Sequence, residues 1–545
     1  MTTAMTHLAD IWEGIADRIG DQPALIHGDR SVNWRDFEAR AARLASALSA
    51  AGLGVGSKIA IDLYNCNEWL EAFFAAIKVR AVPANVNYRY LDDELIHILT
   101  DSHAEALIFH AGLAERILRL RPRLPRIKLL VQVEDGASAP LEGGVAAYEA
   151  LIAGNSAAAR IPRTPDDPYL SYTGGTTGLP KGVMVGLGRA ASSMAFLAPV
   201  LGLTPEDVAD PVATAQRNAA AGDQLIALPA SPLMHSTGFS MTAIPALTYG
   251  GAVVTLTSRS FDPREACAAV ERHGVRLLAI VGDAIGRPIL HALEEGAASG
   301  KPFDMSSIRL MSSAGVAWSA ETKRGLFAFL PQATLLDACG ASEGLTYGFR
   351  SYRKGDALSG TNFTPAPGLV FLDPQGEPGP AVPGASGLMA NSTSASGYYN
   401  DPEKTARTYR LINGMQYVAP GDYGRIEADG TLTLLGRGAT TINTGGEKVH
   451  PEEVEDVIRA HADVDDCLVL GMPDERFGQR VTALVQPREG RAVEGADIVR
   501  HTHARLAGYK APKQVLVVAR IPRGPNGKAD YEQAKAVAAA MAQPS

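Results

Sequence analysis

A segment rich in glycine and threonine is the strongest candidate for chemistry in the sequence. It covers residues 171–182 and reads SYTGGTTGLPKG. Glycines let the backbone curl so that successive N–H groups face one anion, and threonine hydroxyls add further donors. Lys181 adds a positive charge, but Gly182 follows it, so the segment lacks the Gly-Lys-Ser/Thr ending of a Walker A loop. The segment predicts a phosphate-binding loop of another type, the alternative being a flexible surface loop.

A second segment, residues 340–344, has the pattern G-x-S-x-G around Ser342 and follows a strand expected at residues 333–336. In serine hydrolases this pattern exposes a nucleophilic serine on a sharp turn. No convincing oxyanion-hole motif accompanies it here, and a hydrolase would leave the phosphate loop and Lys528 without a role. Serine hydrolase therefore remains only a rival enzyme class.

Further motifs follow the glycine-rich segment in a fixed order. They are PLMH with Gly238 (232–238), GVA (315–317), DACGASE (337–343), GYYNDPEKT (397–405), GDYG (421–424), GR (436–437) and PNGK (525–528). Together these motifs resemble those of the adenylate-forming superfamily, and the resemblance spans most of the chain. Within that superfamily the chain is identified as a member of the acyl-CoA synthetase, or AMP-dependent acid–CoA ligase, family. The resemblance implies that a carboxylate attacks the α-phosphorus of ATP, that pyrophosphate leaves, and that the acyl group then passes to coenzyme A.

The resemblance also implies where the nucleotide binds. Residues 173–181 would hold the β- and γ-phosphates, residues 315–317 would lie along the adenine, and Asp422 would accept the ribose hydroxyls. The full set implied is Thr173, Gly174, Gly175, Thr176, Thr177, Gly178, Lys181, Gly315, Val316, Ala317, Asp337, Ala338, Cys339, Gly340, Ser342, Asp422 and Arg437. Such a displacement depends mainly on alignment and on neutralising phosphate charge.

Three residues take catalytic roles by the same resemblance. Glu343 would hold Mg²⁺, a hard cation that prefers carboxylate and water oxygens. Lys528 would bridge the substrate carboxylate and the α-phosphate as negative charge builds up there. His235 would border the carboxylate pocket; the alternative is a satisfied core histidine.

Transfer to coenzyme A requires a second arrangement of the same chain. Members of the family rotate a small C-terminal domain about a hinge, which the resemblance places at Gly438 and Ala439. Gly445, Gly446 and Glu447 would then face the pantetheine arm. Lys448 and Lys510 are further candidates for contacts with the phosphates of coenzyme A.

The acid pocket is expected to have small walls. His235, Gly238, Gly282 and Ala341 are its predicted residues, and Cys339 stands where many relatives have an aromatic residue. Similar replacements occur in a subgroup that acts on bulky, steroid-like acids. The sequence therefore favours a medium- or long-chain, aryl or polycyclic acid as the substrate.

Other reactions of the acyl-adenylate stay open. The acceptor of the acyl group could be a carrier protein, and a luciferase-like oxidation is not excluded by any motif. A nucleotide sensor without catalytic activity is the binding-module alternative. It is disfavoured because both Glu343 and Lys528 are present.

Composition limits the expected partners and location. The 545 residues carry a formal net charge of −8, and 46% of them are hydrophobic. The acidic balance disfavours nucleic acid, and no apolar run approaches the length of a membrane span. Four widely spaced cysteines show no metal-ligand spacing, which favours a reducing, cytoplasmic setting. The expected partners are thus a carboxylic acid, ATP and coenzyme A; a homodimer stays open.

The elements that position these motifs read as α/β. Apolar residues three or four apart predict a helix over 33–51, with Asn33 as its N-cap. Strands expected at 58–63, 106–109, 127–133, 252–257 and 276–281 alternate with helices, which predicts layers with mainly parallel sheets. We expect a large N-terminal domain at 1–437, with a β-rich section at 360–437, and a small mobile α+β domain at 438–545. Residues 134–160 and 203–224, small and polar, are predicted to be mobile surface.

Overall fold

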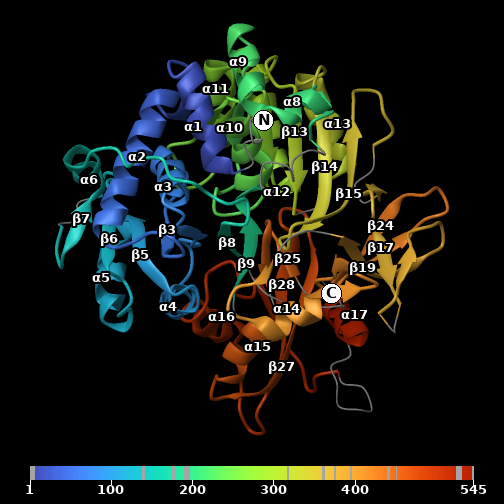
Figure 1. Ribbon diagram of the computed structural model, residues 1–545. Helices are drawn as coiled ribbons and strands as arrows, with labels where there is room; N and C mark the ends of the chain where they lie inside the picture. The colour runs from blue at the N-terminus through green and yellow to red at the C-terminus, as the bar shows by residue number, and fades with distance from the viewer. Residues whose placement is uncertain are drawn as a thin grey trace.

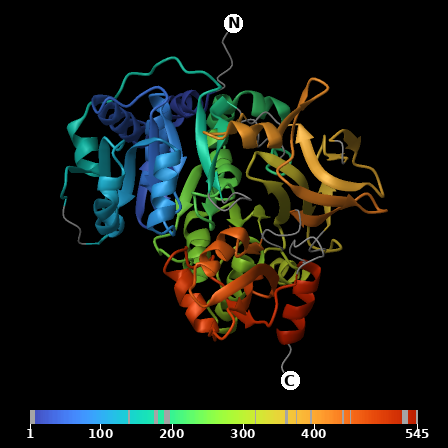
Figure 2. The ribbon, with the colours of Figure 1, turned by 90° about the horizontal axis from the view of Figure 1, so that it is seen from below.

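The computed structural model describes residues 7–137, 141–173, 180–188, 197–315, 318–358, 362–373, 376–392, 396–437, 442–449, 451–522 and 531–542. Three sheets with helices packed against them make up this part of the chain (Figure 1). The first sheet and the β-rich section lie on opposite sides of the molecule, and the C-terminal part lies beneath them (Figures 1 and 2). The predicted α/β class, with a large N-terminal part and a smaller C-terminal part, is confirmed.

The first sheet holds the predicted phosphate loop. Its strand order is β20-β9-β8-β4-β3-β5-β6-β7, parallel from β8 to β7. Its strands are β3 (Lys58–Asp62), β4 (Val82–Asn85), β5 (Ala104–His110), β6 (Leu129–Val133), β7 (Val145–Ala147), β8 (Pro168–Thr173), β9 (Lys181–Gly186) and β20 (Gly397–Tyr398). The helices of this region are α3 (Asn67–Lys78), α4 (Asp92–Asp101), α5 (Ala114–Leu120) and α6 (Tyr148–Gly154). The strands expected near residues 58, 106 and 127 are confirmed.

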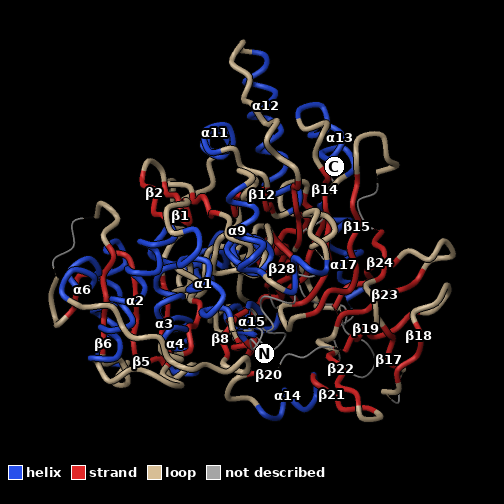
Figure 3. Tube along the Cα trace, turned by 45° about the horizontal axis from the view of Figure 1, so that its top comes forward, coloured by secondary structure: helices blue, strands red, loops and turns tan. Residues whose placement is uncertain are grey.

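The second sheet has sixteen strands within the described residues. Its parallel centre comprises β1 (Pro23–His27), β10 (Ile226–Pro229), β11 (Ala252–Thr255), β12 (Leu277–Ile280), β13 (Leu310–Ala314) and β14 (Thr334–Ala341). The remaining strands are β2 (Arg30–Asn33), β15 (Leu345–Tyr352), β16 (Asn362–Pro365), β17 (Val370–Leu372), β18 (Pro378–Pro380), β19 (Ser386–Ser392), β21 (Tyr409–Ile412), β22 (Met415–Val418), β23 (Asp422–Ile426) and β24 (Leu432–Arg437). Those after β14 form the β-rich section seen at the right of Figure 3.

Helices cover this sheet, and a separate small sheet follows it. The helices are α1 (Leu8–Ile19), α2 (Trp34–Ala50), α8 (Pro205–Ala209), α9 (Pro211–Ala220), the π-helix η3 (Phe239–Ala243), α10 (Ile244–Thr248), α11 (Pro263–His273), α12 (Gly282–Ala298), α13 (Ala320–Phe329) and α14 (Pro402–Thr408). The C-terminal sheet contains β25 (Ile442–Thr444), β26 (Glu447–Val449), β27 (Val464–Asp474), β28 (Gly478–Pro487) and β29 (Gln514–Val517), with α15 (Pro451–Arg459), α16 (Gly495–His503) and α17 (Tyr531–Ala542). No helix in the described part of the chain combines the length and the apolar character that crossing a membrane requires.

Helix α2 forms as the sequence predicts. The Asn33 side chain accepts a hydrogen bond from the Asp36 N–H at 2.7 Å, which satisfies a donor at the helix start. Trp34, Phe37 and Leu44 lie on its fully buried face, with Ala41 and Leu48. The apolar spacing thus marks the surface that the helix buries.

The segment 203–224, predicted to be mobile surface, lies mostly at the surface but forms helices. Two short helices, α8 and α9, occupy this segment, and each begins with a capped turn. Thr204 and Asp207 form a reciprocal capping box, and the Asp210 side chain accepts from the Ala213 N–H at 3.0 Å. Part of the segment 134–160 is likewise regular, because β7 and α6 form there and the Tyr148 side chain is buried.

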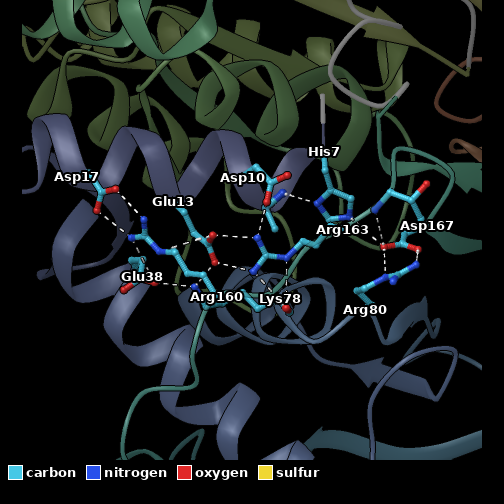
Figure 4. A network of polar contacts seen from close by, with 12 residues as sticks. His7, Asp10, Glu13, Asp17, Glu38, Lys78, Arg80, Arg160, Arg163 and Asp167 are labelled. Atoms are coloured by element: carbon cyan, nitrogen blue, oxygen red, sulfur yellow. Dashed lines mark hydrogen bonds and ion pairs between the residues drawn. The ribbon is translucent and has the colours of Figure 1, made fainter. Parts of the chain in front are cut away.

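A polar network ties the N-terminal helix to the connection that leads into β8 (Figure 4). The Arg163 guanidinium, 1% exposed, pairs with Asp10 and with Glu13, while the Lys78 ammonium contacts Glu13 at 2.6 Å. Arg80 donates two hydrogen bonds to Asp167, the residue before β8, at 2.8 and 2.9 Å. The attraction within a buried ion pair offsets the cost of removing both charges from water only when the two groups are well aligned and hydrogen-bonded. The network therefore fixes the base of the β8–β9 hairpin.

A buried carboxylate at the end of β3 gives a stability prediction. Burial raises the pKa of Asp62 to about 6 although Arg116 lies 3.5 Å away. A raised folded-state pKa means that stability present below the unfolded value is lost as pH rises through the folded one. Asp62→Asn should therefore raise the free energy of unfolding at pH 8 by up to about 3 kcal/mol, since each pKa unit is worth about 1.4 kcal/mol.

Thermal melting at pH 8 and at pH 5 checks this prediction. The advantage of Asp62→Asn should shrink as the pH falls below 6, because the native carboxyl is then protonated. Asp93, whose side chain is 85% exposed, supplies the control variant Asp93→Asn, which should melt like the natural protein. A lower Tm for Asp62→Asn at pH 8 would contradict the argument.

Candidate functional site

A cavity of about 260 Å³ lies where β14, the turn after β10 and the β25–β26 hairpin meet. Predicted site residues from four separate segments line it. They are His235, Gly315, Ala338, Cys339, Gly340, Ala341, Ser342, Gly446 and Glu447. Side chains that the sequence did not suggest also line the cavity, among them Asn85, Tyr169, Ser240 and Met241. The fold thus brings the 337–343 motif and the β25–β26 hairpin, predicted to face the thiol, to the same cavity.

Some predicted residues lie outside the described part of the chain. They are Gly174, Gly175, Thr176, Thr177, Gly178, Val316, Ala317, Gly438, Ala439 and Lys528; Thr173 and Arg437 are described by their backbone. The ends of the phosphate loop are visible, because Thr173 pairs with Lys181 across β8 and β9. The glycine-rich segment therefore leaves and re-enters the sheet at one point. Lys181 itself forms an ion pair with Asp401.

Strand β14 brings its motif to the cavity through an irregular end. The antiparallel register with β15 shifts between Cys339 and Gly340, and a Cβ at Gly340 would lie 2.2 Å from the Leu345 carbonyl oxygen. Only glycine fits so close an approach. Burial raises the pKa of the Cys339 thiol, which donates to the Gly348 carbonyl at 3.4 Å. This thiol is therefore a wall of the cavity and not a nucleophile.

The Asp337 carboxylate is committed to a buried ion pair. It accepts a hydrogen bond from the Lys323 ammonium at 2.8 Å, and the Lys323 side chain is fully buried. Burial raises the pKa of Asp337 to about 6, although Lys323 opposes that shift. Asp337 therefore lies beside the cavity wall, with its charge directed at Lys323.

Glu343 and Asp422 are each held by a tyrosine hydroxyl. Tyr398 donates to Glu343 at 2.6 Å, and Tyr347 donates to Asp422 at 2.5 Å. Asp422 also pairs in register with Arg437 across β23 and β24, which places these two predicted ribose-side residues next to each other. Neither tyrosine was singled out from the sequence, although Tyr398 lies within the GYYNDPEKT motif.

Glu447 joins the C-terminal hairpin to the cavity wall. Its Oε1 lies 3.1 Å from His235 Nε2 and 3.0 Å from Arg89 Nη1. Burial acts to raise the pKa of Glu447, but His235 and Arg89 outweigh it and hold the pKa below its ordinary value. At Gly446 a Cβ would lie 2.4 Å from Val281, so the hairpin packs closely here. With Nε2 engaged by Glu447, His235 gives no support to a hydrolase triad at Ser342.

Two further predicted positions lie behind the cavity wall. A Cβ at Gly238 would lie 2.3 Å from the Pro232 carbonyl oxygen, and the Gly282 N–H donates to Ser313 Oγ at 2.9 Å. Neither residue lines the cavity, in contrast to His235 and Ala341. Gly238 and Gly282 therefore shape the backbone around the predicted acid pocket.

The suggestion that Lys510 meets phosphates of coenzyme A is wrong for this arrangement. Its side chain is 2% exposed and pairs with Glu94 of α4 and, at 2.8 Å, with Glu453 of α15. Burial raises the pKa of Glu453 to about 7, partly offset by Lys510. Lys510 instead joins the C-terminal part to the first sheet region.

Two family profiles match the sequence. That of the AMP-binding enzyme covers residues 12–399, and that of the AMP-binding enzyme C-terminal domain covers residues 453–528. The chain belongs to the AMP-binding enzyme family. The predicted membership in the acyl-CoA synthetases, and with it the class of acid–thiol ligase, is confirmed.

Relatives within the AMP-binding enzyme family match along almost the whole chain. A medium/long-chain-fatty-acid–CoA/3-oxocholest-4-en-26-oate–CoA ligase of Mycolicibacterium smegmatis is 37% identical over 97% of this chain and 96% of its own. A 3-oxocholest-4-en-26-oate–CoA ligase of Rhodococcus rhodochrous is 38% identical, over 97% and 95%. The amide bond synthetase McbA from Marinactinospora thermotolerans matches in structure with a TM-score of 0.77 at 22% identity, over 97% of this chain and 99% of that one. This last match shows the shared fold.

Proposed function

We propose that this AMP-binding enzyme activates a carboxylic acid with ATP and transfers the acyl group to coenzyme A. The observation that carries the proposal is the single cavity shared by β14 and the β25–β26 hairpin. The strand and the turn after it supply the nucleotide side through Ala338, Cys339, Gly340 and Ser342, and the hairpin supplies the thiol side through Gly446 and Glu447. An adenylate formed in this cavity is within reach of a thiol entering along the hairpin.

Different residues of the chain would bind the different parts of the two substrates, ATP and the acid. The phosphate loop and Lys181 hold the pyrophosphate, Gly315 and Cys339 border the adenine, and Asp422 with Arg437 binds the ribose side. Alignment of the carboxylate with the α-phosphorus supplies much of the rate, because it removes the entropy of bringing two reactants together. His235 borders the acid, and Lys528 neutralises charge at the reacting oxygens.

Mg²⁺ fits the donors around Glu343. The described residues contain no group of three or more His, Cys, Asp or Glu side chains suited to holding a metal by themselves. Mg²⁺ does not need one, since it binds through one or two carboxylates together with waters and substrate phosphates. Glu343, a buried carboxylate next to Ser342 of the cavity wall, suits that role. When bound, the ion would neutralise phosphate charge.

The C-terminal part acts as a lid over residues 438–545, with the catalytic domain at 1–437. The ends of the two family profiles, 399 and 453, support a boundary between them. With the hairpin at the cavity, the lid has the orientation that thiol transfer needs. Rotation about Gly438 and Ala439 would bring Lys528 to the same cavity for the first half-reaction.

The acid is of medium or long chain, or is polycyclic and steroid-like. Two observations support this choice: the names of the relatives, and the small side chain of Ala341, the predicted acid-pocket residue that lines the cavity together with His235. Small side chains leave room for a wide substrate. Loading of a carrier protein is the second candidate for the acceptor. A cytoplasmic location and a homodimer stay predictions.

Pyrophosphate release with MgATP across a panel of acids tests the proposal. Acetate, propionate, octanoate, palmitate, benzoate and 3-oxocholest-4-en-26-oate would each be assayed with and without coenzyme A. Release that depends on one acid class, with an acyl-CoA product, is the expected result. Acid-dependent release without acyl-CoA would move the acceptor to a carrier protein. A preference for acetate or propionate would overturn the wide pocket, and hydrolysis of simple esters would revive Ser342 as a nucleophile.

A further inference from the structure

The segment 397–401, which comprises β20 and the residues that lead from it to α14, contacts both ends of the proposed metal–phosphate site. Tyr398 of this segment donates its hydroxyl proton to Glu343 Oε1 at 2.6 Å, in a buried contact. Three residues further on, Asp401 pairs with Lys181 at the end of the phosphate loop. One short stretch of chain therefore bonds to the proposed Mg²⁺ ligand and to the loop cation.

The backbone of this segment is held from two directions. Gly397 and Tyr398 pair with Met184 and Val183 of β9, and the Tyr399 N–H donates to the Gly182 carbonyl at 2.7 Å. On the other side, Thr405 of α14 accepts from the Tyr398 N–H at 2.9 Å. The position of the Tyr398 ring is thus set by the hairpin that frames the phosphate loop.

The ring of Tyr398 is fixed by its neighbours. The Tyr409 ring meets it edge-on, with centroids 5.6 Å apart, and the Lys404 ammonium lies 4.7 Å from its centroid. A phenol with its ordinary pKa of about 10 is protonated at neutral pH and can donate, whereas an ionised carboxylate can only accept. A fixed donor at one carboxylate oxygen orients the other oxygen of the same group.

We propose that Tyr398 is a positioning residue that orients the Glu343 carboxylate toward the Mg²⁺–nucleotide complex and keeps it in register with the phosphate loop. The inference rests on the proposed function, because it takes Glu343 as the metal ligand. Outer partners of metal ligands set ligand orientation, and their loss typically weakens metal binding about 10- to 100-fold.

Tyr398→Phe tests the inference, because it removes the hydroxyl and keeps the ring. The half-saturating Mg²⁺ concentration for pyrophosphate release should rise about 10- to 100-fold, while kcat at saturating Mg²⁺ recovers to within about threefold of the natural value. Recovery at high Mg²⁺ also shows that the variant is folded. An independent readout is Mn²⁺ binding, followed by electron paramagnetic resonance with α,β-methylene-ATP, which should weaken by the same factor.

The chain offers a matched control in Tyr409→Phe. Tyr409 is as buried as Tyr398 and packs on the same ring, and its hydroxyl has no hydrogen-bond partner among the described residues. This variant should leave the Mg²⁺ dependence unchanged. If both tyrosine variants raised the half-saturating Mg²⁺ concentration equally, the effect of Tyr398 would come from packing and not from its hydroxyl. That result would overturn the inference.

Glu343→Gln separates the inference from the proposed function. A shift in Mg²⁺ dependence for Glu343→Gln but not for Tyr398→Phe would leave Glu343 as the ligand and overturn the role of Tyr398. No shift in either variant would remove Glu343 from the metal site, and the inference would fall with it. A shift in both, with Tyr409→Phe unchanged, supports it.

Discussion

Replacing Lys528 by alanine is expected to slow acyl-adenylate formation by about 10²- to 10³-fold, the usual cost of losing one donor to a developing negative charge. The proposed role of its ammonium is confined to the first half-reaction, in which the carboxylate and the α-phosphate approach each other. Acid-dependent exchange of labelled pyrophosphate into ATP measures this step alone.

The same variant should still make the thioester. A preformed acyl-adenylate mixed with coenzyme A should give acyl-CoA at close to the natural rate, because we propose that the hairpin at Glu447 serves that step and that Lys528 does not. Lys513→Ala, at an exposed lysine of the same C-terminal part, is the control and should change neither rate. Equal losses in both half-reactions would contradict a lid with two orientations.

Replacing Glu447 by glutamine should produce the opposite pattern. The change keeps the size of the side chain and removes the charge that contacts His235 and Arg89. Hydrogen bonds to charged groups contribute about 1.5–3 kcal/mol, so thiol transfer should slow by about 10- to 100-fold. Adenylate formation, to which we assign the other orientation of the C-terminal part, should stay within about threefold of the natural rate.

Single-turnover mixing of the enzyme-bound adenylate with coenzyme A measures the transfer step. Glu475→Gln, at an exposed glutamate in the turn between β27 and β28, is the matched control. If Glu447→Gln slowed adenylate formation and left thiol transfer unchanged, Glu447 would act in the first half-reaction, and the prediction would be contradicted.

Local patterns in the sequence predicted much of the fold. The spacing of Trp34, Phe37 and Leu44 identified α2 and its buried face, and the β-branched runs identified the parallel strands. The small polar composition of the segment 203–224 indicated its exposure but not its two helices. Thr204 with Asp207, and Asp210 before Pro211, are helix-start signals that composition alone does not reveal.

The site was predictable only where its residues lie together in a motif. Ala338 and Cys339 lie in β14 and Ser342 directly follows that strand, so the motif located them together at the cavity wall. The contact of Glu447 with His235 joins residues 212 positions apart, and Arg89 has no motif around it. Tyr398 likewise reaches Glu343 only through the pairing of β20 with β9. Such contacts depend on how separate sheets pack, which periodicity and spacing do not specify.

The burial of Lys510 has a consequence for the speed of turnover. Its two partners, Glu94 and Glu453, belong to different parts of the chain, so the rotation that we propose for the C-terminal part must separate the ammonium from Glu94. The parted charges then return to water, where dissolved ions stabilise them over distances of about 10 Å at 0.1 M salt. Where lid rotation limits the cycle, kcat should therefore rise with ionic strength. The ion pair makes the turnover rate of this enzyme depend on the salt around it as well as on its substrates.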